Sequence, residues 1–198
     1  MSEAESPEVA RSGPGRSEKR RFLRLLAVFA AVGAVVVGVP LVYGIVQARR
    51  AAAEARIVGQ LQAYKEAQYA WHREGREGAS KLRYVQDYTR LVDFKDAPEA
   101  VRKLVDPAFA AARGADGAPK HGCRYREMRT IFGNAINWDG DFAICATPAV
   151  YGKTGRKTYL MKTDGDVWAK DLGKSEFVTD FPSGIESAGW VKVEPQKR

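Results

Sequence analysis

The chain has 198 residues, of which 45% are hydrophobic and 28% are charged, the composition of an ordinary globular protein. These values exclude a fully disordered, collagen-like or disulfide-dense chain, and the length suits one domain of ordinary size. The net charge of +8 suggests a protein that binds nucleic acid, but half of this charge lies in the first 50 residues. The rest of the chain carries only +4, so nucleic acid is not expected as a partner.

Residues 1–21 are rich in Ser, Glu, Pro and Gly and are predicted to form a disordered cytoplasmic tail. The run Leu25–Val46 contains no charge and predicts a transmembrane helix over residues 22–48, because its helical length matches a bilayer's hydrocarbon core. Basic residues are denser before the run than after it, which predicts an extracytoplasmic domain over residues 49–198. A cleaved signal peptide remains the alternative, with Ala51–Ala53 resembling a cleavage site.

Small residues recur every four positions within the predicted span, at Ala30, Ala34 and Gly38. Such a stripe allows two membrane helices to approach closely, although small residues are also common in membrane helices generally. The stripe is therefore a candidate surface for helix association in the bilayer.

Helical spacing continues after the span without a Pro. Five side chains fall on one helical face, with Gln68 as the polar member: Ile57, Leu61, Tyr64, Gln68 and Trp71. One helix is therefore predicted from about residue 22 to residue 74, half in lipid and half outside. Its four apolar members are the expected packing residues.

Two short helices are predicted next, over residues 81–94 and 98–113, and then the pattern changes to strands. Strand-like runs cover residues 123–132, 141–147, 157–163 and 166–171, with turn residues between them and a candidate edge strand near residues 190–193. The predicted fold is α+β: a long N-terminal helix, membrane-spanning in its first half, packed on a small antiparallel sheet.

Two groups of residues make the chain resemble the type IV pilins and pseudopilins. The first group is Leu61, the run Ala67–Trp71, Tyr88 and Leu91, and the second is the run Phe142–Pro148 with Gly152, Gly155 and Tyr159. The resemblance covers roughly residues 22–172. It implies a pilin-like fold, a place in the bacterial envelope, and other envelope proteins or pilin-like subunits as partners.

The chain departs from that family at the processing site. Prepilins carry a Gly, then Phe or Met, then a Glu at the fifth mature position, whereas here Arg21 precedes Phe22 and Leu26 stands fifth. Cleavage by a prepilin peptidase and ordinary filament assembly are therefore not expected. A pseudopilin that assembles without this Glu remains an alternative.

Cys123 and Cys145 are the only cysteines, and an extracytoplasmic domain would favour a disulfide between them. A three-residue loop at residues 133–135 would place Cys123 opposite Cys145. A loop around residues 137–140 would shift this pairing and remains open. The rival interpretation is that Cys123 is a nucleophile activated by His121. No third member of a catalytic triad is identifiable, so no catalytic residue is assigned.

Two Asp-Gly-Asp tripeptides supply four carboxylates: Asp139, Asp141, Asp164 and Asp166. Calcium is the cofactor that they would suit, because it binds oxygen ligands and some pseudopilins hold it near the sheet, but neither tripeptide continues as an EF-hand. Hairpin turns explain both tripeptides, and no other cofactor is expected. No pair of carboxylates stands out as glycosidase-like. The alternative function is an anchored or secreted hydrolase whose carboxylate site is not recognisable from the sequence.

Basic residues gather at two further places. Arg124, Arg126 and Arg129 surround Tyr125 in a strand-like run, where an exposed strand face is preferred to a nucleic-acid surface. The run Gly152–Lys157 precedes a strand and is interpreted as a basic turn, because the frame of a phosphate-binding loop is missing.

These observations together predict a single-pass protein of the bacterial inner membrane with a cytoplasmic N-terminus and a periplasmic pilin-like domain. The expected function is structural or protein-binding, with no catalytic activity evident. The expected partners are the lipid bilayer and other envelope proteins or pilin-like subunits.

Overall fold

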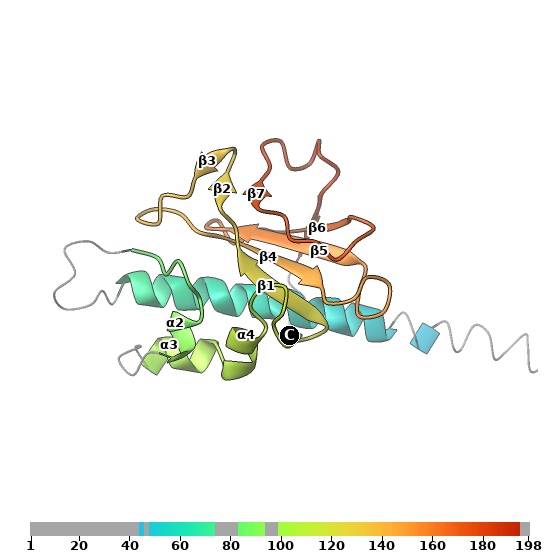
Figure 1. The fold of residues 1–198 in the computed structure, drawn as a ribbon, viewed down its shortest axis with the longest axis horizontal. Helices are drawn as coiled ribbons and strands as arrows, with labels where there is room; N and C mark the ends of the chain where they lie inside the picture. The colour runs from blue at the N-terminus through green and yellow to red at the C-terminus, as the bar shows by residue number, and fades with distance from the viewer. Residues whose placement is uncertain (1–43, 46–47, 74–82, 94–98, 195–198) are drawn as a thin grey trace, which may run out of the picture. The chain divides into compact units, whose positions relative to one another are not determined.

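The computed structural model describes residues 44–45, 48–73, 83–93 and 99–194 (Figure 1). Arg49 to Arg198 form one compact unit. The predicted tail lies outside the described residues, as do Ala30, Ala34 and Gly38 and all of the predicted span except residues 44–45 and 48.

A helix over residues 48–73 lies along one face of an antiparallel sheet (Figure 1). Its inward stripe is buried at Ile57, Leu61 and Tyr64, and Trp71 is half-buried at its end. Burying a side chain such as Leu61 is worth about 2 kcal/mol, so this stripe supplies much of the attachment. The helix is also fixed to the sheet by polar contacts, since the Tyr69 hydroxyl donates to the Thr163 carbonyl at 2.5 Å.

The larger sheet has five strands in the order β1-β4-β5-β6-β8, and all its neighbours are antiparallel. Its strands are β1 (Cys123–Glu127), β4 (Ala143–Pro148), β5 (Lys157–Lys162), β6 (Val167–Asp171) and β8 (Val191–Val193). The β5–β6 turn contains Gly165 at a φ of 83°, a left-handed conformation that glycine adopts at little steric cost.

Both faces of this sheet are buried. On the helix side, the core includes Tyr125, Phe142, Ile144, Tyr159 and Met161. A second core on the opposite face includes Ala143, Cys145, Leu160, Trp168 and Trp190. Strand β4 is consequently buried at every residue, as expected for a strand covered on both sides.

A second sheet of three short strands, in the order β3-β2-β7, adjoins the second core. Its strands are β2 (Thr130–Ile131), β3 (Asn134–Ala135) and β7 (Asp180–Phe181). The single strand predicted over residues 123–132 is therefore divided between two sheets. The β2–β3 turn places Phe132 and Gly133 at φ values of 56° and 77°, the left-handed pair that a tight hairpin turn uses.

Three short helices precede the strands: α2 (Arg90–Asp93), α3 (Glu99–Leu104) and α4 (Pro107–Ala111). Asp106 caps α4, because its carboxylate accepts a hydrogen bond from the Phe109 amide at 2.8 Å, and Pro107 occupies the first turn. Phe109 is fully buried and stacks on Tyr88 with ring centres 4.5 Å apart. These contacts bring the chain before β1 onto the helix-side core.

The prediction of a helix with a membrane-spanning first half is wrong for the part of the chain that the structure describes. No helix in that part is long and apolar enough to cross a membrane. The 48–73 helix carries charges from Arg49 to Arg73 and buries only one stripe, so it is amphipathic rather than apolar all round. The predicted single-pass placement in the inner membrane, with a periplasmic domain, depended on that span and is not supported.

The predicted disulfide is also wrong, because Cys123 and Cys145 are both free. Cys123 lies opposite Pro148, and Cys145 lies opposite Arg126, three residues away from the expected register. An odd shift turns a side chain to the other face of a sheet, so Cys123 belongs to the helix-side core and Cys145 to the second core. The physical reason is that the β2–β3 hairpin and a further turn, rather than one short loop, connect β1 to β4.

Candidate functional site

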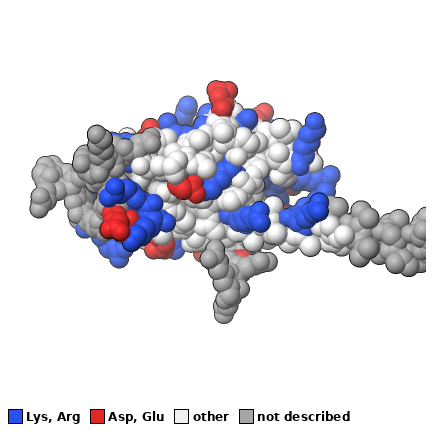
Figure 2. Space-filling model, turned by 90° about the horizontal axis from the view of Figure 1, so that it is seen from below, with Lys and Arg blue, Asp and Glu red and all other residues white. Residues whose placement is uncertain are grey.

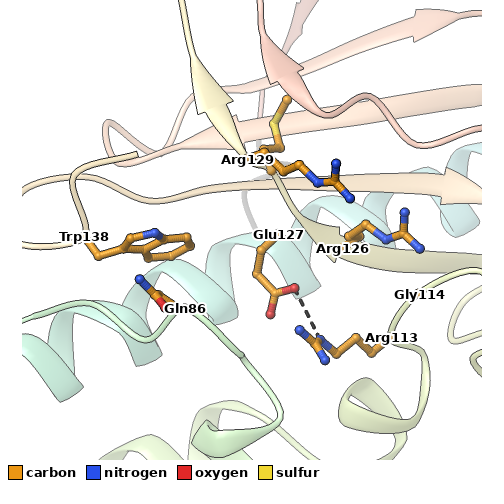
Figure 3. A pocket seen from close by; sticks show the side chains of 8 residues that line it. Gln86, Arg113, Gly114, Arg126, Glu127, Arg129 and Trp138 are labelled. Atoms are coloured by element: carbon orange, nitrogen blue, oxygen red, sulfur yellow. Dashed lines mark hydrogen bonds and ion pairs between the residues drawn. The ribbon is translucent and has the colours of Figure 1, made fainter. Parts of the chain in front are cut away.

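A pocket of about 690 Å³ lies where β1 ends and the chain crosses to the smaller sheet (Figure 3). Its lining residues come from four separate segments: Gln86, Arg113, Gly114, Arg126, Glu127, Met128, Arg129 and Trp138. We call this site the arginine pocket, because three of these eight residues are arginines.

Glu127 forms the acidic centre of the arginine pocket (Figure 3). The alternation of β1 turns this side chain toward the core, where it is only 7% exposed. Its carboxylate accepts a hydrogen bond from the Tyr88 amide at 2.6 Å and from Nε of Arg113 at 3.3 Å. Burial nevertheless raises the pKa of Glu127, and these two donors only partly offset that effect.

The three arginines differ in their partners. Arg113 lies between two carboxylates, because its Nη1 also contacts Oδ2 of Asp87 at 3.1 Å. The Arg126 guanidinium lies over the Phe177 ring, 4.6 Å from its centre, in a cation–π contact. Arg129 is exposed, and within the described residues no carboxylate pairs with Arg126 or Arg129.

Trp138 and Gln86 form the wall opposite Arg126 and Arg129 (Figure 3). The Trp138 carbonyl accepts a hydrogen bond from the Tyr84 amide at 2.7 Å, which ties the turn before β4 to the segment that carries Gln86. The Trp138 side chain is half-buried and packs against both hydrophobic cores. The aromatic wall is therefore rigidly supported.

The arrangement suits the binding of an anion. Arg113 is already compensated by Glu127 and Asp87, whereas no carboxylate of the described residues pairs with Arg126 or Arg129, so these two can donate to a ligand. A guanidinium presents a planar fork of donors that matches a carboxylate or a phosphate. The half-buried indole of Trp138 adds a flat apolar surface for the rest of a ligand.

The four aspartates of the predicted calcium site lie in turns. Asp139 contacts Nε of Arg83 at 2.7 Å, and Asp166 contacts Nζ of Lys192 at 2.9 Å. Asp164 pairs with Lys162, and Asp141 accepts a hydrogen bond from the Thr163 hydroxyl. Among the residues that the structure describes, no group of three or more His, Cys, Asp or Glu side chains could hold a metal ion.

The nucleophile that the sequence raised as a rival is buried. Burial raises the pKa of both Cys123 and Cys145 to about 12, so neither thiol is ionised near neutral pH. His121 is exposed at a φ of 53°, next to Gly122 in the tight turn before β1. The residues Gly152–Arg156 lie in the connection between β4 and β5, and Lys157 is the first residue of β5.

The sequence singled out Arg126 and Arg129 but missed Arg113, Glu127 and Trp138 as their neighbours. Arg113 and Trp138 come from outside β1, so their approach depends on the path of the chain. Glu127 did carry a signal, since it is an acidic residue at an inward position of the alternating run Cys123–Glu127. An acidic side chain at a buried position requires a partner, which here is Arg113.

Residues 123–181 are similar to a family whose model is described as a protein of unknown function (DUF2950). This stretch runs from the first residue of β1 to the last residue of β7, and it includes Arg126, Glu127, Arg129 and Trp138. Arg113 and Gln86 lie outside it. No curated protein and no solved structure matches the chain.

Proposed function

We propose that this chain is a binding protein with a structural or protein-interaction role, and that it contacts a partner protein at the arginine pocket. The observation that carries the proposal is the pocket itself. It is open to solvent and has two arginines that no described carboxylate compensates.

The packing of the unit supports this role. The 48–73 helix packs on β1, β4, β5 and β6 and forms a closed scaffold with them (Figure 1). Both cores are closed around the sheet, whereas the pocket residues sit at its border, on loops and strand ends. Binding residues are commonly placed on such loops above a rigid scaffold.

Site-specific photo-crosslinking in the cells that produce the protein tests the proposal. A photoreactive residue in place of Gln86, which is exposed at the pocket rim, should yield adducts of discrete protein mass. The charge reversal Arg129→Glu should remove them, because it reverses the local field. Adducts that are absent, or that also form from the exposed position Lys174 and survive Arg129→Glu, would contradict the proposal.

A further inference from the structure

We propose that the arginine pocket receives an acidic peptide segment of the partner, in an extended conformation, with its carboxylates on Arg126 and Arg129. This inference rests on the proposed function and adds the chemistry of the partner. Three observations support it: the charge balance of the pocket, the direction of the two arginines, and the backbone carbonyl at the end of β1, which is unpaired among the described residues.

The charge balance selects an anion. Arg113 contacts Glu127 at 3.3 Å and Asp87 at 3.1 Å, so its positive charge is already compensated by carboxylates of the same chain. Arg126 is held over Phe177, a contact that leaves its edge donors available. Two guanidinium groups therefore remain for a ligand, which matches two carboxylates on one short segment.

The two arginines extend to the same side of the pocket (Figure 3). Arg126 is in β1 and Arg129 lies three residues further, after the strand has ended. Nη2 of Arg126 lies near Gly114, where an added Cβ would be 3.8 Å away, so this guanidinium is beside the loop rather than inside the core. A ligand that reaches both groups must lie along the end of β1.

The edge of β1 favours an extended chain as that ligand. β1 is an outer strand, and the outward groups of Tyr125 are paired, with its amide to the Ala112 carbonyl and its carbonyl to the Gly114 amide. Glu127 is two residues further, so its backbone faces the same edge, and none of the described backbone amides pairs with its carbonyl. An incoming segment would find a hydrogen-bond acceptor there, next to the two arginines.

The same observations disfavour nucleic acid. The carboxylates of Glu127 and Asp87 contact Arg113, so this side of the pocket carries negative charge that would repel a chain of phosphates. On the face shown in Figure 2, Lys and Arg lie in separate groups between large uncharged areas and do not form a continuous basic stripe. A nucleic-acid strand needs such a stripe to follow its backbone.

Fluorescence anisotropy with the full chain and a labelled hexaglutamate peptide tests the inference. Hexaglutamate should bind more tightly than hexaglutamine, and Arg126→Ala or Arg129→Ala should each weaken binding roughly tenfold, the loss expected for one charge-assisted contact. Arg156→Ala removes an exposed arginine in the β4–β5 connection and should leave binding unchanged. Matching denaturation curves for the three variants would show that their folds are intact.

Three results would overturn the inference. One is equal binding of hexaglutamate and hexaglutamine, and another is equal loss in all three variants. The third is tighter binding of labelled oligothymidine or of inorganic phosphate than of hexaglutamate. If any of these occurs while the adducts from position 86 still depend on Arg129, the proposed function stands and only the acidic chemistry of the partner is wrong.

Discussion

Buried polar side chains connect segments that are distant in the sequence. Gln68 lies on the inward face of the 48–73 helix and is fully buried. Its amide oxygen accepts from the Val85 amide at 2.8 Å, and its amide nitrogen donates to the Val85 carbonyl at 2.9 Å and the Tyr64 hydroxyl at 2.7 Å. One side chain therefore holds the segment that carries Gln86 to the helix.

Replacing Gln68 by Leu should lower the free energy of unfolding by about 2–4 kcal/mol, because the amide and carbonyl of Val85 would be buried without partners. The matched control is Gln62→Leu. Gln62 is half-buried and makes one hydrogen bond, to the Gly165 carbonyl, so its loss should cost about 1 kcal/mol. Urea denaturation of both variants makes the comparison, and equal losses would contradict the role given to Gln68.

Glu127 should give the stability of the protein a characteristic pH dependence. Its folded pKa is raised by burial, so the folded state binds the proton more tightly than the unfolded state does. This contribution is present below the pKa of the unfolded state, about 4.3, and is lost as the pH rises through the folded pKa. The free energy of unfolding of wild type minus that of Glu127→Gln should therefore fall as the pH is raised from about 4.

Denaturation of both proteins across this range measures that difference. The control is Glu186→Gln, since Glu186 is exposed in the loop before β8. A difference for Glu127→Gln that stays constant with pH, or that rises, would show that the carboxylate is not penalised by burial.

At the scale of elements, strand periodicity could be predicted from the sequence but strand register could not. The turn residues and apolar alternation located β4, β5 and β6 to within about two residues, whereas β1 and β2 were predicted as one strand. The register between β1 and β4 depends on the excursion through β2 and β3, whose strands of two residues each are too short to leave a pattern. The arginine pocket also depends on the path of the chain through β2 and β3, because this path brings Trp138 close to the end of β1.

The register predicts the reactivity of the two cysteines. Because Cys123 and Cys145 lie on opposite faces of the sheet and are buried, the purified protein should contain two free thiols that react slowly in the folded state. Titration with a thiol reagent at pH 8, before and after denaturation, measures this. Rapid labelling of the folded protein, or an intact mass 2 Da lower, would contradict the assignment of the two faces.

The β2–β3 hairpin depends on one carboxylate from β7. Asp180 accepts hydrogen bonds from the Thr130 hydroxyl at 2.5 Å and from the Gly133 amide at 2.9 Å, and so holds the left-handed turn at Phe132. Asp180→Ala should lower the free energy of unfolding by about 1–3 kcal/mol, because two charge-assisted hydrogen bonds are lost. Asp116→Ala, at an exposed turn position, is the control, and an equal effect of both in thermal denaturation would refute this role.

At the scale of the whole unit, the buried surfaces stabilise the fold, and the surface at the arginine pocket is open to a ligand. The helix and the two sheets close two cores around β4, and the arginine pocket lies at their border. Trp138 packs against both cores and also lines the pocket, so it reports on the pocket from a fixed position. The other three tryptophans, Trp71, Trp168 and Trp190, are absent from the pocket lining.

The most direct measurement of the central claim is the nuclear magnetic resonance spectrum of the four indole N–H groups of the full chain during a titration with hexaglutamate. We expect the Trp138 signal, assigned with Trp138→Phe, to move and saturate while the signals of Trp71, Trp168 and Trp190 stay in place. A Trp138 signal that does not move, or four signals that move alike, would contradict the claim that the arginine pocket binds an acidic partner.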